Sequence, residues 1–241
     1  MQLATRYAKL NFNEAYDRIA KLVEGKAPKA WRAKADQDTC MKAIIRAWQS
    51  GQEATNLTGP VQAYLKKRTG RHWASNSLRE CTAIWNNHEQ KHFPAMVWKV
   101  ASPEGKAINL HITHLTSAGE KAQIERAKLF MAGTIPEGSA IRLMKEAPIM
   151  GVAEGVETAL AASIMFGMPV WATGNATLLA KWVPPELAEK ITIFGDNDES
   201  FTGHAKAYAL ANRLTVQFKK QVDVKICPEI GKDFADMLGL K

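Results

Sequence analysis

The chain reads Val152-Ala153-Glu154-Gly155-Val156-Glu157-Thr158-Ala159-Leu160 and, further on, Ile191-Thr192-Ile193-Phe194-Gly195-Asp196-Asn197-Asp198. Each stretch begins with a short apolar run that is typical of a buried strand, and each run ends in acidic residues. The carboxyl ends of parallel strands meet at one edge of a sheet, where open α/β folds have their binding sites. Carboxylates gathered at such an edge would form an all-oxygen site of the kind that Mg²⁺ or Mn²⁺ prefers.

The C-terminal part of the chain alternates between strand-like and helix-like segments. The expected strands are Ile149–Ala153, Val170–Thr173, Ile191–Gly195 and Val222–Ile226. The expected helices are Glu157–Phe166, Thr177–Trp182, Gly203–Leu214 and Phe234–Leu238. This order predicts an α/β fold, in which helices cover both faces of a mainly parallel sheet.

The part of the chain before residue 146 has a different pattern. The expected helices are residues 1–25, Asp38–Gln49 and Gly59–Thr69, with a linker at Lys26–Asp38. A β-hairpin is expected from Ala95–Val100 and Ala107–Leu115. The predicted domains are an N-terminal helix with its linker (1–37), a small basic α+β subdomain of helices and a hairpin (38–145), and the α/β domain (146–241).

Charge is distributed unevenly along the chain, whose net charge is +8. Residues 1–150 contain 23 Lys and Arg against 13 Asp and Glu, whereas residues 151–241 contain 9 against 11. A basic part joined to an acidic part suits a protein that binds a polyanion with one and metal ions with the other. A solvated basic surface without such a partner is the alternative.

Composition excludes several classes of protein. There is no apolar run of about 18 residues and no signal-peptide pattern, which predicts a cytoplasmic protein without membrane contact. Cys40, Cys81 and Cys227 form no C-x-x-C pair, so neither a disulfide framework nor a zinc ribbon is expected.

Three motifs in order carry a resemblance to a known family. They are Glu154-Gly155 before a helix, Asp196-x-Asp198 after a strand, and Gly231-Lys232-Asp233-Phe234-Ala235-Asp236 near the end. Together they resemble the Toprim domain, the Rossmann-like catalytic module of bacterial-type primases, topoisomerases and some nucleases. The spacing and the Gly-Lys-Asp ending look most like the primases of phages, plasmids and other mobile elements. The resemblance covers residues 95–241 well and 55–95 more loosely.

The resemblance implies roles for individual residues. Glu154, Asp196 and Asp198 would be catalytic and would bind Mg²⁺ or Mn²⁺, with Asp233 as an outer ligand. Asp196 and Asp198 are two residues apart, so a regular strand would present both on one face. The candidates for contact with nucleic acid or nucleotide are Lys121, Arg126, Lys128, Lys232 and Gly155.

Structural alternatives stay open for several of these residues. Asp196-Asn197-Asp198 is also compatible with a turn that caps the next segment. Glu157 could assist the acids, or it could be an N-terminal acid that interacts favourably with the dipole of its own helix. Lys232 could meet a phosphate or be a solvated turn lysine.

His88-Glu89-Gln90-Lys91-His92 matches the H-E-x-x-H signature of zinc proteases. That chemistry requires both histidines on one face of a stable helix. Asn86-Asn87 before the motif and Phe93-Pro94 after it favour a loop. We therefore do not expect zinc proteolysis.

The resemblance implies a DNA primase core that makes short RNA primers on single-stranded DNA from ribonucleoside triphosphates, with a replicative helicase as a further partner. A Toprim nuclease and a non-catalytic module that binds nucleic acid or docks on replication proteins are the alternatives. The zinc ribbon that usually precedes such a core is absent from this sequence. The chain is therefore expected to be a fragment of a longer primase or a natural remnant of one.

Overall fold

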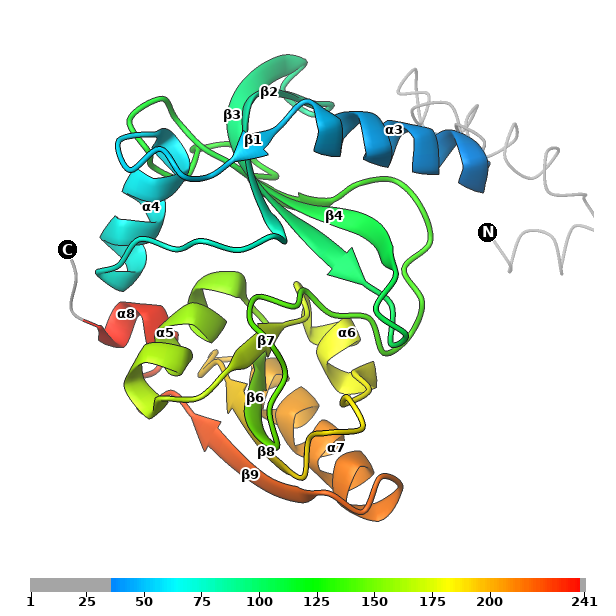
Figure 1. Ribbon diagram of the computed structural model, residues 1–241. Coiled ribbons are helices and arrows are strands. Elements are labelled where there is room, and N and C mark those ends of the chain that lie inside the picture. Colours follow the sequence, from blue (N-terminus) through cyan, green and yellow to red (C-terminus); the bar gives the residue numbers. More distant parts are fainter. Residues whose placement is uncertain (1–35, 239–241) are drawn as a thin grey trace, which may run out of the picture. The chain divides into compact units, whose positions relative to one another are not determined.

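The computed structural model describes residues 36–238 (Figure 1). The first elements are α3 (Gln37–Gln49), β1 (Gln52–Glu53), α4 (Pro60–Thr69), β2 (Leu78–Asn86), β3 (Lys91–Ala101), β4 (Ala107–His114) and β5 (Lys128–Phe130). They are followed by β6 (Ile149–Ala153), α5 (Val156–Phe166), β7 (Val170–Ala172), α6 (Ala176–Lys181), β8 (Lys190–Gly195), α7 (Thr202–Val216), β9 (Gln221–Ile226) and α8 (Phe234–Met237). The helix predicted over residues 1–25 and most of the predicted linker lie outside the described residues.

The first five strands form an antiparallel sheet in the order β1-β2-β3-β4-β5. Alternate residues of β3 face opposite sides of this sheet because successive side chains of a strand point to opposite faces. Val97 packs with Ile44 of α3 on one side, whereas Trp98 packs with Leu65 of α4 on the other. The two helices therefore cover different faces of the sheet.

The predicted hairpin is confirmed but incomplete, since the sheet also contains β1, β2 and β5. Local sequence does not predict β2 as a strand. Its buried positions do not alternate regularly, and a register shift separates Cys81 from Ile84. Pairing with β3 fixes this strand, and such pairing is not visible in local periodicity. Strand β5 has only three residues, too few for a pattern.

The H-E-x-x-H segment lies in the turn between β2 and β3 and at the start of β3. The Asn86 side chain accepts hydrogen bonds from the backbone N–H groups of His88 (2.9 Å) and Glu89 (3.0 Å). His92 already belongs to β3. The two histidines therefore do not share a helix face; residues 87–90 form a turn as predicted, whereas the end of the motif belongs to a strand rather than to the predicted loop.

The last four strands form a parallel sheet in the order β7-β6-β8-β9. Side chains of β6 and β8 alternate between its faces, so that Val152 and Ile193 pack toward α6 and α7. Ala153 and Phe194 pack instead with α5 and α8. Helices thus cover both faces, as Figure 1 shows, and the predicted α/β class is confirmed for this part of the chain.

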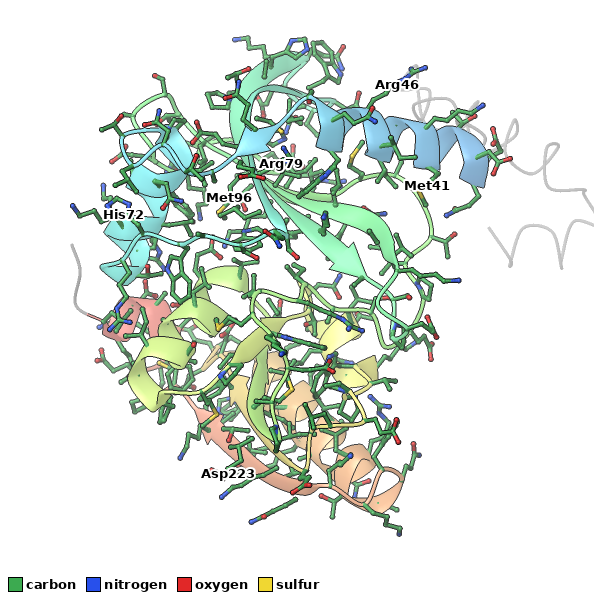
Figure 2. All side chains as sticks on the ribbon, viewed as in Figure 1. Met41, Arg46, His72, Arg79, Met96 and Asp223 are labelled. Atoms are coloured by element: carbon green, nitrogen blue, oxygen red, sulfur yellow. The ribbon has the colours of Figure 1, made fainter. Side chains whose placement is uncertain are left out.

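The side chains divide between this interior and the solvent (Figure 2). Met96 is fully buried in the core that the antiparallel sheet, α4, α5 and α8 share. Arg46, His72 and Asp223 are exposed. No helix within residues 36–238 combines the length and the apolar character needed to cross a lipid bilayer.

A steric test of the parallel sheet is available at Gly151 of β6. A Cβ atom at this position would lie 2.5 Å from Cε2 of Phe194 and 3.1 Å from the carbonyl oxygen of Thr192. We expect Gly151→Ala to lower the free energy of unfolding by about 1–3 kcal/mol, as overpacked cores do. Urea denaturation measures this change. In a double-mutant cycle, Gly151→Ala should cost less stability in the Phe194→Leu background than in the wild type, and an equal cost in both backgrounds would show that this contact is not the cause.

Candidate active site

Three loops meet at the carboxyl edge of the parallel sheet. Glu154 follows β6, Gly174 follows β7 and Asp196 follows β8. They line one cavity of about 160 Å³, together with Asp233 at the start of α8 and Lys128 of β5. The structure therefore brings Glu154, Asp196 and Asp233, which are distant in sequence, to one place.

Asp196 is the most perturbed carboxylic acid of this edge. Burial, followed by the nearby charges of Glu154 and Asp233, raises its pKa to about 7. Its Oδ1 atom is buried and has no hydrogen-bond partner among the described residues. Burial also raises the pKa of Glu154. An unpartnered carboxylate oxygen beside other acids is an arrangement that a cation would stabilise.

Asp198 makes different contacts. Strand β8 ends at Gly195, so the alternation of a regular strand does not extend to Asp196 and Asp198. The Asp198 carboxylate accepts hydrogen bonds from Ser200 Oγ and from the backbone N–H groups of Thr202 (3.0 Å) and Gly203 (2.6 Å) at the start of α7. These hydrogen bonds lower the pKa of Asp198 to about 2, and the bond from Ser200 has the largest effect. Asp198 therefore caps the segment that follows it, which is one of the two alternatives that the sequence left open.

A second cavity, of about 250 Å³, adjoins this edge. Asp196 and Asp233 line both cavities, whereas Asp198 and Lys232 line only the second. The Lys232 ammonium forms an ion pair with Glu229 three residues earlier. Lys232 is therefore near the acids, but its one ion pair in the described structure is local.

Gly155 has an extended backbone and is the N-cap of α5, without a side-chain hydrogen bond to the helix. It lines the 160 Å³ cavity beside Glu154. Gly155 therefore contributes only backbone atoms to the cavity at the start of this helix.

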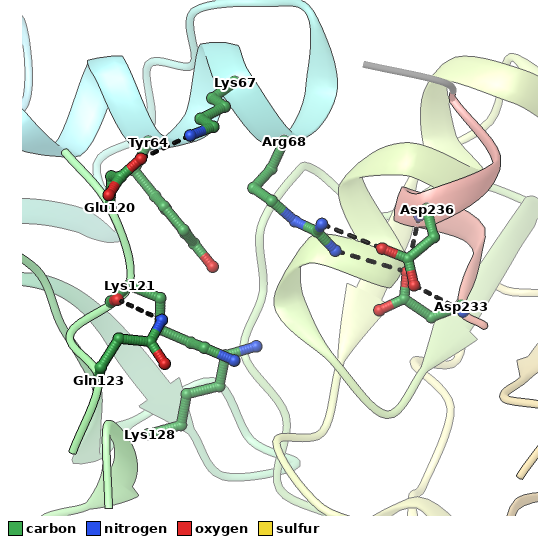
Figure 3. Close-up of a pocket in the computed structure, with 9 residues that line it drawn as sticks. All are labelled: Tyr64, Lys67, Arg68, Glu120, Lys121, Gln123, Lys128, Asp233 and Asp236. Atoms are coloured by element: carbon green, nitrogen blue, oxygen red, sulfur yellow. Dashed lines mark hydrogen bonds and ion pairs between the residues drawn. The ribbon is translucent and has the colours of Figure 1, made fainter. Parts of the chain in front are cut away.

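A larger cavity of about 450 Å³ lies between the antiparallel sheet, α4 and α8 (Figure 3). Its lining residues are Tyr64, Lys67, Arg68, Glu120, Lys121, Gln123, Lys128, Asp233 and Asp236. Two of the predicted contact residues, Lys121 and Lys128, are among them. Arg126 lines none of these three cavities; its carbonyl oxygen accepts a hydrogen bond from Asn86.

Helix α4 supplies cavity residues that sequence reasoning missed. Arg68 pairs with Asp236 (Nη1 to Oδ1, 3.0 Å) and with Asp233 (Nη2 to Oδ1, 3.7 Å), as Figure 3 shows. Asp233 and Asp236 also form a reciprocal capping box at the start of α8. The basic run Lys66-Lys67-Arg68 was the available signal, but a basic last turn is ordinary in helices.

The family comparison assigns the C-terminal part of the chain. A model of the Toprim domain matches residues 149–241. Residues 149–241 are a Toprim domain. A second family, described as a domain of unknown function (DUF7146), matches residues 39–143. No curated protein matches the chain.

Primase cores and fragments are among the solved structures that the chain resembles. The DnaG catalytic core has a TM-score of 0.53 at 14% identity, over 84% of this chain and 75% of that one. The primase fragment of the bacteriophage T7 primase-helicase protein has a TM-score of 0.49 at 14% identity, over 79% and 72%. A DNA primase domain from Pseudomonas aeruginosa has a TM-score of 0.42 at 16% identity, over 66% of this chain and about half (52%) of that domain. The DnaG match establishes a shared fold.

The acids of the Toprim domain fit a divalent cation by their chemistry rather than by a ready-made geometry. Within residues 36–238, no group of three or more His, Cys, Asp or Glu is arranged to hold an ion as it stands. The fit rests on the unpartnered Oδ1 of Asp196 and on the raised pKa values of Asp196 and Glu154, since a cation would relieve both.

Proposed function

We propose that the chain is the catalytic core of a DNA primase, which makes short RNA primers on single-stranded DNA from ribonucleoside triphosphates. The observation that carries the proposal is the junction of the acidic edge with the large cavity, whose lining contains four cationic residues (Lys67, Arg68, Lys121 and Lys128) and three acidic ones (Glu120, Asp233 and Asp236). The acidic edge of the Toprim domain and the large cavity beside α4 share Lys128 and Asp233. Joining nucleotides requires both a place for phosphate and acids that hold cations beside it.

Glu154, Asp196 and Asp233, with Asp198 beside them, would hold Mg²⁺ or Mn²⁺. Such an ion neutralises charge on the transferred phosphate and promotes deprotonation of the attacking hydroxyl. Because Asp198 already accepts three hydrogen bonds, we propose that it orders the loop after β8 and contributes its remaining lone pairs.

The basic residues would bind the polyanionic substrates. Lys121 and Lys128 project into the large cavity, where Lys67 also lies. Cationic side chains around a cavity attract nucleic acid and nucleotides through their phosphates. We propose this cavity as the entry to the acidic edge, with Arg126 and Lys232 as contacts outside it and a replicative helicase as a separate partner.

The experiment is primer synthesis by the full chain. Single-stranded DNA, labelled ribonucleotides and Mg²⁺ or Mn²⁺ are incubated with the protein, and the products are separated on a denaturing gel. Short labelled RNA that disappears with EDTA is the expected result. A second reaction with a short RNA already annealed to the template tests extension separately from template engagement.

Two other outcomes would replace the proposal. Degraded DNA without RNA synthesis in either reaction would indicate a metal-dependent nuclease that uses water as the nucleophile. Tight, salt-sensitive DNA binding without any chemistry would indicate a binding module. Omission of ribonucleotides is the control that separates synthesis from degradation.

A further inference from the structure

Glu157 is a buried carboxylate with two side-chain partners from other parts of the chain. Its side chain is only 3% exposed. Oε1 accepts a hydrogen bond from Tyr64 Oη at 2.6 Å, and Oε2 accepts one from Lys128 Nζ at 2.7 Å. The three residues belong to α5, α4 and β5, so this contact joins the Toprim domain to the helix and strand that precede it.

These contacts keep Glu157 ionised. Burial opposes the charge, but the Lys128 ammonium and the two hydrogen bonds lower the pKa of Glu157 to about 2. An acid that only complemented the dipole of α5 would not need two partners from other elements. Burying a carboxylate costs desolvation free energy, so we look for a role of Glu157 in the side chains that it binds.

The charged partner of Glu157 is Lys128. The Lys128 side chain is 40% exposed, and an ammonium group has three N–H donors, of which Glu157 takes one. Lys128 lines both the large cavity and the cavity at the acidic edge. Burial raises the pKa values of Glu154 and Asp196, and the Lys128 charge partly opposes both rises. Its charge therefore acts on the acids as well as on the large cavity.

We propose that Glu157 is a positioning residue: together with Tyr64 it fixes the Lys128 ammonium at the junction of the two cavities, where the free N–H groups bind the phosphates of an incoming nucleoside triphosphate. The inference rests on the proposed function, because it assigns this triphosphate as the ligand. A flexible lysine loses side-chain freedom when it binds a phosphate, and an anchor that restricts it beforehand reduces that loss.

Glu157→Gln tests the anchor. The amide keeps the shape of the side chain and can still accept from Tyr64, but it no longer attracts the Lys128 ammonium. We expect the KM for ribonucleotides in primer extension to rise about tenfold, the effect of one charge-assisted hydrogen bond, with little change in kcat. Lys128→Met should act similarly, and the double variant should be no worse than the poorer single variant, because both remove one interaction.

A binding measurement keeps this test independent of catalysis. Inorganic triphosphate is titrated into the full chain by calorimetry, which requires no polymerisation and so stays informative if the chain is not a primase. Glu157→Gln should weaken this binding by the same factor as it raises KM. Glu137→Gln is the matched control, since Glu137 also pairs with a lysine, Lys181, but is exposed and lines none of these cavities.

Three results would overturn the inference. The first is that Glu157→Gln binds triphosphate as tightly as the wild type. The second is that the increases in KM caused by Glu157→Gln and Lys128→Met multiply in the double variant. The third is that the wild type does not bind triphosphate. If Glu157→Gln does not fold, Tyr64→Phe replaces it. That variant keeps every charge, and it is expected to weaken triphosphate binding by a smaller factor of about threefold, the size of one neutral hydrogen bond. Unchanged binding by Tyr64→Phe would then count against the anchor.

Discussion

Asp196→Asn is expected to abolish primer synthesis. The carboxylate lies at the end of β8, where its Oδ1 has no hydrogen-bond partner within residues 36–238 and Glu154 and Asp233 lie nearby. An amide of the same shape removes the charge that would hold a divalent ion. Because such an ion supplies several kcal/mol of transition-state stabilisation and each ~1.4 kcal/mol is a tenfold change in rate, we expect a loss on the order of 10²-fold or more.

The measurement is primer extension under initial-rate conditions over a range of Mn²⁺ concentrations. Asp223→Asn is the control with the same chemical change, because Asp223 is an exposed residue of β9 that pairs only with Lys225 in the described structure. The control should match the wild type. Wild-type turnover by Asp196→Asn would show that this residue does not belong to the active site. The far-UV circular dichroism spectrum of the variant should match that of the wild type, which shows that a loss of activity does not come from unfolding.

The same substitution should stabilise the metal-free protein at high pH. The Asp196 pKa is raised from 3.8 to about 7 in the fold, mainly by burial. Between these values the unfolded chain loses its proton first, so this residue lowers stability as pH rises and its full penalty applies above about pH 7. A shift of this size corresponds to about 4 kcal/mol. Asparagine resembles the neutral acid and avoids the penalty.

Urea unfolding in EDTA at pH 8 and at pH 5 measures this effect. Asp196→Asn should unfold at a higher urea concentration than the wild type at pH 8, with a clearly smaller difference at pH 5. Adding Mn²⁺ should stabilise the wild type and narrow the gap, because a ligand that binds only the folded state stabilises it. Equal differences at both pH values would show that Asp196 does not carry the raised pKa.

Local sequence patterns predicted the elements of the Toprim domain well. The apolar runs before Glu154 and Asp196 are buried strands, and helices follow them as expected. The same reasoning failed for β2, whose irregular burial and register shift follow from its pairing with β3. The predicted end of the strand at Gly195 is correct, but Asp196 and Asp198 do not share a strand face, because both follow β8 and the Asp198 carboxylate accepts hydrogen bonds from the start of α7.

The assignment of catalytic roles to Glu154, Asp196, Asp198 and Asp233 remains a prediction, as do the domain boundaries at residues 37 and 145. Bringing Glu154 and Asp196 together requires only that parallel strands end at one edge of a sheet. That requirement is general to the fold class, so position along the chain was enough to bring Glu154 and Asp196 together.

The sequence by itself determined the parallel sheet, its helices and the acids at its edge, because strand and helix periodicity and strand ends are local properties. Only the tertiary structure decided that Tyr64 and Lys128 meet Glu157, and that Arg68 meets Asp236. Tyr64 is 93 residues from Glu157, and Arg68 is 168 residues from Asp236. No local pattern encodes such pairs, since they depend on how α4, β5, α5 and α8 pack around a shared core.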